Sequence, residues 1–250
     1  MWTFTEDAWD TFFFKRKMGK LHFERQVRSP GFPSRAILKA GLETTLGLTQ
    51  QLGFRHVVCR LHESEAALQG VLKAAGFKLY DEGVTCLFHD RANRRLEKPS
   101  RRVRLAHREE IPMINRFAAA SFVFSHFYRN PFFKRKEVDR YHAQWVRNIF
   151  KKPEGRILIV EEKGRPIAFL AYDYDAKDKK VKMLLQATDP KFRGQGIATE
   201  LLKGLLVWGR ARRVRLISSR MNQTNQAILR VHQKLGFKRD FEDATFCRTL

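Results

Sequence analysis

The sequence predicts a mixed α/β protein, and three observations carry this prediction. An apolar strand, a loop with two glycines and an amphipathic helix follow one another between residues 181 and 206. A second strand and a second helix follow between residues 214 and 235. The third observation is an internal repeat, in which residues 55–88 overlay residues 215–248 after a shift of 160 positions. Together these features indicate strands and helices that alternate in two related halves.

The first of these segments has the properties of a phosphate-binding loop. The strand ends at Asp189-Pro190, because proline cannot donate to a strand ladder. Gly194 and Gly196 then form a short loop, and a helix begins directly after it. Unpaired N–H groups and the positive end of the helix dipole suit phosphate oxygens at such a place. Arg193 adds a forked charge.

Two other phosphate loops do not fit this segment. A dinucleotide fingerprint requires Gly or Ala at the position of Thr199 and an acidic residue about twenty positions later, where residues 216–219 offer none. A P-loop requires Gly-Lys followed by Ser or Thr, which is absent. The pattern Arg-x-x-Gly-x-Ala, formed by Arg193, Gly196 and Ala198, resembles the acetyl-CoA pyrophosphate loop of the GNAT acetyltransferase superfamily.

The downstream segment strengthens this resemblance. GNAT enzymes commonly show Asn-x-x-Ala at the start of the next helix, a Tyr seven residues after the Asn, and then Gly-Phe. This chain has Asn225, Ile228 where that Ala is common, His232 and Gly236-Phe237. The resemblance covers roughly residues 156 to 250. It implies a GNAT fold with a central mixed, mostly antiparallel sheet.

The resemblance also implies where acetyl-CoA would bind. In GNAT enzymes the strand before the loop splays open, and its N–H groups hold the acetyl carbonyl. The residues expected at the cofactor are Gln186, Ala187, Thr188, Arg193, Gly194, Gln195, Gly196, Ile197, Ala198, Thr199 and Asn225. For Asn225 a simple helix cap is an equal alternative.

His232 is the candidate proton donor. It lies two helical turns after Asn225, so both side chains are expected on one face, toward the splayed strands. A histidine can protonate a leaving thiolate near neutral pH. A surface histidine without a catalytic role is the alternative. The strand position where some superfamily members carry a Glu base holds Arg220, so that base is missing.

The repeat predicts two domains. Residues 98–250 would form the catalytic GNAT domain, and residues 1–97 a smaller, degenerate GNAT-like lobe that precedes it. In this lobe the loop position reads Pro33–Ala36 without a glycine pair, and Leu72 stands opposite His232, so no CoA site is expected there. The basic segment 91–104 is predicted to be the interdomain linker.

Three further stretches resemble the TDP-fucosamine N-acetyltransferase branch of the superfamily, namely residues 9–14, 51–54 and 125–148. This resemblance implies an acceptor amine on a nucleotide-linked sugar. Aromatic and basic side chains could bind such an acceptor by stacking and by forked contacts to a diphosphate, although packing on the sheet is an alternative for each. These candidates are His126, Tyr128, Arg129, Tyr141 and Trp145.

Charge and composition limit the possible partners. A net charge of +23 would steer polyanionic substrates and could bind nucleic acid without specificity, or it could serve solubility alone. No apolar run approaches the roughly twenty residues of a membrane span. Three dispersed cysteines show no zinc spacing, so no metal is expected. These features and the lack of a signal peptide predict a cytoplasmic protein without a membrane partner.

The sequence therefore favours an acetyl-CoA-dependent N-acetyltransferase acting on a small amine. Two alternatives stay open: a protein or aminoacyl N-acetyltransferase, and a non-catalytic basic GNAT-like module that binds nucleic acid. The intact loop from Arg193 to Ala198 disfavours the last, because a chain without catalysis would be free to lose it.

Overall fold

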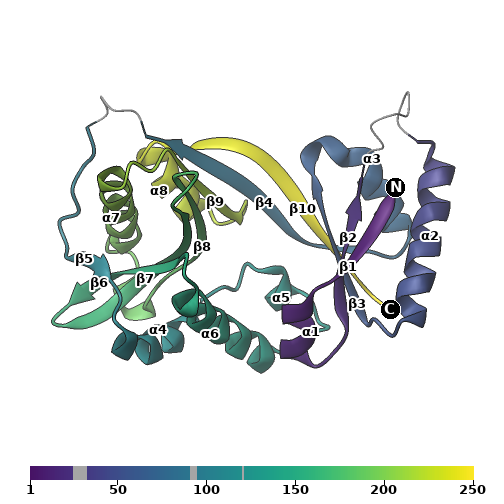
Figure 1. Cartoon of the computed structure of the whole chain (residues 1–250), viewed down its shortest axis with the longest axis horizontal. Coiled ribbons are helices and arrows are strands. Elements are labelled where there is room, and N and C mark those ends of the chain that lie inside the picture. The colour runs from purple at the N-terminus through teal and green to yellow at the C-terminus, as the bar shows by residue number, and fades with distance from the viewer. Residues whose placement is uncertain (25–32, 91–94, 120) are drawn as a thin grey trace. The chain divides into compact units, whose positions relative to one another are not determined.

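The computed structural model describes residues 1–24, 33–90, 95–119 and 121–250, which form two compact units (Figure 1). Unit 1 comprises Met1–Gly83, Ser125–Phe133 and Phe241–Leu250, and unit 2 comprises Val84–Phe124 and Lys134–Asp240. The predicted mixed α/β class is confirmed. In the described residues, no helix is long and apolar enough to cross a membrane.

The predicted boundary between residues 97 and 98 needs correction. Strand β4 (Lys78–His89) begins in unit 1 and ends in unit 2, and β10 (Lys238–Thr249) does the reverse. Strand β3 (His56–His62) pairs antiparallel with β10 from Asp243 to Thr249, so β10 lies between β3 and β4 in the sheet of unit 1. Each half of the sequence therefore gives a strand to the other half's sheet, which the repeat alone could not reveal.

The structure repeats the same elements at the shift found in the sequence. The bounds of β3, α3 (Ala66–Ala74) and β4 recur 160 residues later as β9 (Leu216–Asn222), α8 (Gln226–Lys234) and β10. Gly76 and Gly236 follow the two helices with φ of +81° and +87°. This left-handed conformation favours glycine after a helix, so both copies end their helix in the same way.

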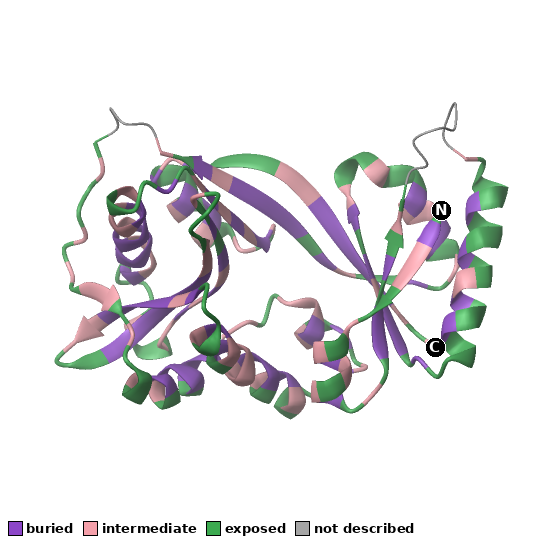
Figure 2. Ribbon diagram, viewed as in Figure 1, coloured by how far each residue is buried: buried purple, intermediate pink, exposed green. Residues whose placement is uncertain are grey.

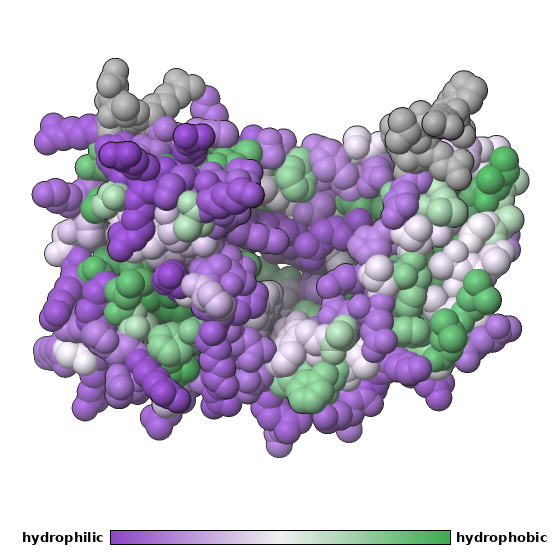
Figure 3. Space-filling model, in the orientation of Figure 1, coloured by the Kyte–Doolittle hydropathy of each residue, from purple (hydrophilic) through white to green (hydrophobic). Residues whose placement is uncertain are grey.

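Unit 1 packs helices on a short sheet. Its strands β1 and β2 are antiparallel, and β2 and β3 are parallel. Leu38, Leu42 and Leu46 recur at helical spacing and bury one face of α2 in the core. The opposite side of this helix carries exposed apolar residues, and Figure 3 shows hydrophobic side chains over it. The remaining elements of this unit are β1 (Trp2–Glu6), α1 (Ala8–Phe14), β2 (Met18–Phe23), α2 (Arg35–Gln51) and α5 (His126–Arg129).

Unit 2 has a larger sheet with helices on both faces. The sheet runs in the order β4-β9-β8-β7-β6-β5, and all its pairs from β5 to β8 are antiparallel. Alternate strand residues face α7 and α8 on one side and α4 and α6 on the other, and both interfaces are buried (Figure 2). Its further elements are β5 (Val103–Leu105), α4 (Ile111–Ala118), α6 (Arg135–Lys151), β6 (Gly155–Glu162), β7 (Arg165–Asp175), β8 (Lys180–Thr188) and α7 (Ile197–Ala211).

The basic segment predicted as an interdomain linker lies within unit 2, where it connects β4 to β5. Residues 91–94 fall outside the described residues. The rest is bound: the buried carboxylate of Glu200 accepts hydrogen bonds from the N–H groups of Ser100 and Arg101 and, at 2.9 Å, from the Ser100 hydroxyl. Lys203 pairs with Glu97 at 2.8 Å. The segment is therefore fastened along α7 instead of bridging two domains.

We expect Glu200→Gln to lower the free energy of unfolding by about 1–2 kcal/mol, because hydrogen bonds to a charged group are stronger than neutral ones. Burial alone would raise the pKa of Glu200, but the hydrogen bonds from Arg101 and Ser100 and the charge of Lys203 hold that pKa below its ordinary value. A depressed carboxyl pKa contributes stability above the unfolded value, and this contribution is lost as pH falls through the folded value.

Urea unfolding at several pH values measures this effect. The difference between wild type and Glu200→Gln should shrink below about pH 4.5, the ordinary range of a glutamate. Glu97→Gln is the matched control, since Glu97 also pairs with Lys203 but is exposed. Equal destabilisation by both substitutions would contradict the role given to Glu200.

Candidate functional site

The site begins where strands β8 and β9 separate. These parallel strands are paired only from Lys180 to Met183 on β8, opposite Leu216 to Ser219 on β9. Beyond this point β8 continues to Thr188 without β9 as a partner. The register between β7 and β8 shifts at the same place, which leaves Leu184 as an extra residue in a β-bulge. A bulge bends its strand, so it accounts for the divergence of β8 from β9.

The gap between the strands opens into a cavity of about 470 Å³. Its walls come from the end of β8, the glycine loop with the start of α7, the start of α8, and the segment after α4. The lining residues are Ser121, Val123, Phe124, Gln186, Ala187, Thr188, Phe192, Arg193, Gly194, Gly196, Ile197, Ala198, Thr199, Asn225, Ala227, Ile228 and Val231. All residues expected at the cofactor line this cavity except Gln195.

The glycine loop presents free backbone donors to this cavity. The N–H groups of residues 194–198 have no hydrogen-bond acceptor among the described residues, whereas Thr199 and Glu200 donate to the carbonyl of Gly196. Gly194 and Gly196 have φ of +78° and +75°, and a Cβ at either would meet no atom within 4 Å. Glycine is thus required here by the backbone conformation and leaves an open cradle for an anion.

Polar side chains extend this cradle. The Arg193 Nε donates to the carbonyl of Thr188 at 3.3 Å, which holds the guanidinium beside the loop. Gln186 donates its Nε2 to the carbonyl of Ala198 at 3.4 Å, while its buried Oε1 has no partner among the described residues. Asn225 caps α8 by accepting from the N–H of Ile228 at 3.4 Å and also lines the cavity, so the two readings of Asn225 are compatible.

The end of β8 can also offer donors to a carbonyl oxygen. The N–H of Asp189 donates to the carbonyl of Ile167 on β7 at 2.9 Å. Successive N–H groups of a strand point to opposite edges. The N–H groups of Thr188 and Gln186 therefore point to the side from which β9 has diverged. Two donors on one edge of a cavity form the arrangement that stabilises a developing oxyanion.

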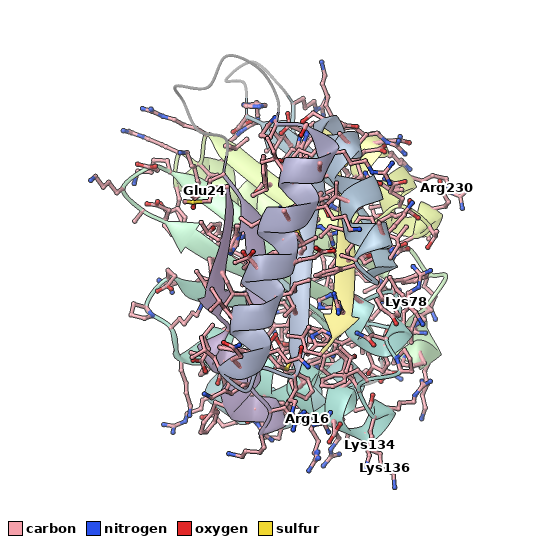
Figure 4. The ribbon with its side chains drawn as sticks, turned by 90° about the vertical axis from the view of Figure 1, so that its right-hand side faces the viewer. Arg16, Glu24, Lys78, Lys134, Lys136 and Arg230 are labelled. Carbon is pink, nitrogen blue, oxygen red and sulfur yellow. The ribbon has the colours of Figure 1, made fainter. Side chains whose placement is uncertain are left out.

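His232 does not lie where the sequence argument put it. Its side chain is 1% exposed and is absent from the cavity lining. Its Nδ1 contacts the carbonyl of Ile228 at 2.9 Å, and its Nε2 lies 3.0 Å from the hydroxyl of Ser219 on β9. Ile228 and Val231 line the cavity in its place, and Arg230 extends to solvent (Figure 4).

The electrostatics of His232 also argue against the role of an acid. Burial lowers the pKa of His232 to about 4, although the carbonyl of Ile228 favours the charged form. The ring is therefore neutral near pH 7, with the proton on Nδ1 because a carbonyl can only accept. Its Nε2 is then engaged as an acceptor for Ser219. The expectation of a cavity-facing proton donor is corrected: this histidine ties α8 to β9.

The five acceptor candidates are divided between the two units. Three of them, His126, Tyr128 and Arg129, belong to α5 in unit 1. The lining of the unit 2 cavity therefore gives no information about their role. Tyr141 and Trp145 lie on α6 in unit 2 and do not line the cavity. Tyr141 is buried, and its ring centroid lies 6.0 Å from that of Trp145. For these two residues, packing takes the place of the expected stacking on a substrate.

Comparisons with known proteins find similarity in the part of the chain that forms the site. The model of the Acetyltransferase (GNAT) family matches residues 121–237, which hold the separated strands, the glycine loop and α8. This segment is similar to GNAT acetyltransferases. An uncharacterized N-acetyltransferase of Methanocaldococcus jannaschii is 25% identical over 112 residues, covering 43% of this chain and 48% of that relative. The chain thus matches about half the length of this curated relative.

Solved structures share the fold over most of the chain. A GCN5-related N-acetyltransferase from Sphaerobacter thermophilus matches with a TM-score of 0.65 and 13% identity, over 99% of this chain and 76% of that one. A tandem GNAT protein from the clavulanic acid biosynthesis pathway matches with a TM-score of 0.60 and 12% identity, over 93% and 75% of the two chains. At these identities the likeness concerns the fold alone.

The sequence analysis did not predict the apolar wall of the cavity in unit 2. Val123 and Phe124 line it and are 44% and 40% exposed, so two large apolar side chains face open space there. Neither belongs to a helix or strand, and no spacing rule applied to them. The indication available in the sequence was Phe122-Val123-Phe124 within a loop, since a loop segment that carries several apolar residues needs an explanation.

In unit 1 the helix that corresponds to α7 has a side-chain cap in place of the glycine loop. Helix α2 begins after Ser34, whose hydroxyl accepts from the N–H of Ile37 at 3.4 Å. The corresponding cap of α7 is Gly196, which has no side chain to bind the helix donors. The residues from 25 to 32 are not described. The start of α2 is thus capped from within, whereas the start of α7 keeps its donors for a ligand.

We expect Gly196→Ala to weaken acetyl-CoA binding by about tenfold or more. The added Cβ enters the anion-binding loop, and alanine disfavours the left-handed conformation, so the loop amides shift. The loss of one hydrogen bond to a charged group is sufficient for a tenfold loss of affinity. Gly164→Ala is the matched control. Gly164 has the same φ of +75° and the same open space, but it lies in the β6–β7 turn. Calorimetric titration should find unchanged acetyl-CoA affinity in the control. Equal affinity in both variants would contradict the proposal that the glycine loop binds the pyrophosphate.

We expect His232→Leu to destabilise the protein by roughly 2 kcal/mol at pH 7.5, since the buried Ser219 hydroxyl loses its acceptor, while kcat changes by less than about twofold. The pKa of His232 is lower in the folded protein than in the unfolded chain. The unfolded chain therefore binds a proton below about pH 6.5, whereas the folded protein binds it only below about pH 4. Wild type loses stability as pH falls between these two values. The gap between wild type and variant should therefore narrow by about 2 kcal/mol at pH 5.

Urea unfolding at the two pH values tests this prediction. His56 and His142, which burial also holds neutral with pKa values lowered to about 4, contribute to both proteins and cancel in the difference. A loss of kcat of a hundredfold or more in folded His232→Leu would instead restore a catalytic role.

Proposed function

We propose that this protein transfers an acetyl group from acetyl-CoA to the amino group of a small molecule. The observation that carries this proposal is the combination, in one cavity, of free loop amides at one wall and inward N–H groups where β8 leaves β9. The first wall suits a pyrophosphate, and the second suits a thioester carbonyl. The unpartnered Oε1 of Gln186 between them can accept from an amide N–H of the cofactor's arm.

The residues suggest how the reaction proceeds. The neutral amine attacks the thioester carbonyl, whose oxygen gains charge and is held by the N–H groups of Gln186 and Thr188. The carbon–sulfur bond then breaks, and the proton that the attacking nitrogen loses passes through water to the leaving sulfur, so the products are the amide and the CoA thiol. Arg193 is the one lining side chain among the described residues that carries a charge. The lining thus supplies positioning and hydrogen bonds and contains no titrating acid.

For the acceptor we propose an amino sugar linked to a nucleotide. The cavity lining contains no Asp or Glu in the described part of the chain, so it offers nothing to a polycationic acceptor. The net charge of +23 would attract an anionic acceptor. The stretches at 9–14, 51–54 and 125–148 that resemble the TDP-fucosamine branch support the same choice. His126, Tyr128 and Arg129 remain predicted acceptor residues on the strength of that resemblance alone.

Acetylation can be tested by following thiol release from acetyl-CoA and the mass of the product. Acceptors should include nucleotide-linked amino sugars, the free amino sugars and a peptide amine. We expect turnover with the nucleotide-linked compounds, loss of turnover in Gly196→Ala at low acetyl-CoA, and normal turnover in Gly164→Ala. Turnover with the peptide alone would shift the proposal to a protein acetyltransferase. The absence of thiol release with every acceptor, in protein that binds acetyl-CoA, would reject the proposed activity.

The pH dependence of the reaction follows from the lining. We expect kcat/KM to rise with pH until the acceptor amine is neutral, so the midpoint should move when an acceptor with a different amine pKa is used. A midpoint near pH 6.5 that stays fixed for all acceptors and disappears in His232→Leu would show that this histidine titrates during catalysis.

A further inference from the structure

One end of the unit 2 sheet gathers basic side chains from two connections. The β7–β8 turn and the α7–β9 loop meet there, because the N–H of Arg215 donates to the carbonyl of Lys179 at 2.8 Å and Lys180 is the parallel partner of Leu216. The two connections together define a basic edge, which consists of Lys177, Lys179, Lys180, Arg212, Arg213 and Arg215.

Acidic side chains nearby leave most of this charge unbalanced. Asp178 pairs with Lys180 at 3.0 Å. Asp175 accepts the N–H groups of the turn, at residues 177 and 178, through its Oδ1. Over the described residues, no carboxylate forms a salt bridge with Lys179 or with any of the three arginines of the basic edge. Several exposed cations in one place repel one another, so an anionic partner would stabilise them.

Aromatic side chains position one of these cations but leave no exposed ring face on which a nucleic-acid base could stack. The guanidinium of Arg212 lies 4.4 Å above the ring of Trp208. The ring of Trp208 packs in turn against Tyr172 and Tyr174, with centroids 5.1 and 5.2 Å apart. Because Arg212 covers the indole, Trp208 does not present that face for base stacking. The edge is therefore suited to phosphates, whose contacts carry no sequence information.

The same place in unit 1 provides an internal comparison. There the N–H of Arg55 donates to the carbonyl of Lys17 at 2.8 Å, as Arg215 does to Lys179 in unit 2. Unit 1 carries Leu52 and Gly53 where the repeat has Arg212 and Arg213. Lys17 donates to the carbonyl of Leu52 at 3.0 Å, so in unit 1 this cation is bound within the fold.

Arg213 occupies a backbone conformation that suits glycine. Its φ is +58°, and Gly53 has φ of +81° at the matching turn of unit 1. A left-handed residue with a Cβ costs roughly 1–2 kcal/mol. Within the described residues, the side chain of Arg213 makes no hydrogen bond or salt bridge that would offset this cost. Unit 2 thus keeps an arginine at a position where glycine would be more stable.

We propose that the basic edge binds the phosphate backbone of a nucleic acid. Several unbalanced cations on adjoining turns match a polymer that carries one charge about every 3.4 Å along each strand. A membrane surface fits less well, because the large exposed apolar residues in the described ranges all lie outside these two connections. The basic edge is a binding function separate from acetyl transfer.

The basic edge and the acetyl-CoA cavity lie at opposite ends of β8. The strand starts at Lys180 and reaches the cavity at Gln186 to Thr188. The six to eight residue steps between these points span about 20–26 Å of extended strand. A nucleic acid at the edge therefore leaves the loop amides accessible, and substitutions at the edge should not change acetyl-CoA affinity.

The decisive variant is Arg213→Gly. It removes one charge and relieves the left-handed strain, so we expect higher stability together with weaker binding to a fluorescent 20-base-pair RNA duplex, measured by anisotropy in full-length protein. The slope of log K against log salt should fall in magnitude by about 1, the value for one lost phosphate contact. A DNA duplex of the same length should behave similarly, because it shares the phosphates. Unchanged affinity in the stabilised variant would overturn the proposal.

A pair of charge reversals separates the basic edge from the net charge. Arg213→Glu with Arg215→Glu should weaken duplex binding by about tenfold or more and reduce the salt slope by about 2. The control is Arg140→Glu with Arg147→Glu on α6, which changes two exposed arginines and the net charge by the same amount. Equal loss in both double variants would assign binding to the overall field and overturn the proposed site, as would stronger binding to vesicles of anionic lipid than to the duplexes.

Discussion

The divergence of β8 from β9 is the constraint on which the remaining site depends. The two strands stay paired as far as Met183 and Ser219, and the bulge at Leu184 then bends β8 away. Paired strands would have consumed the N–H groups of Gln186 and Thr188 in a ladder, and no cavity would exist between them. The divergence also brings the end of β8 to the glycine loop. One interruption of hydrogen bonding thus creates both the N–H donors that we propose for the thioester carbonyl and the cavity that we propose for the cofactor.

The repeat shows what the site requires beyond the fold. Both units have a parallel strand pair, a helix before the second strand and a glycine cap after the next helix. They differ at the start of the first of these helices, where Ser34 binds a helix donor in unit 1 and Gly196 leaves the donors free in unit 2. A serine cap is the ordinary way to stabilise a helix. Its absence at α7 leaves free amides, which are available to the ligand that we propose.

The sequence predicted the elements of the fold and the phosphate end of the site because both follow from local rules. Helical and strand spacing, the glycine pair and the Asn225 cap all act within a few residues of one another. The exchange of β4 and β10 between the units could not be predicted, because both strands have the same pattern and either could pair with β3. His232 was misplaced for a related reason. Helical spacing gives the direction of a side chain but not its partner. The partner of His232 is the hydroxyl of Ser219 on β9.

We propose that the amides of residues 194–198 bind the pyrophosphate of acetyl-CoA. A crystal structure of the complex tests this claim most directly. We predict pyrophosphate oxygens within hydrogen-bond distance of these amides, and the thioester carbonyl within the same distance of the N–H of Gln186 or Thr188. Acetyl-CoA bound at the start of α2 in unit 1, or bound with its pyrophosphate away from the glycine loop, would contradict the account.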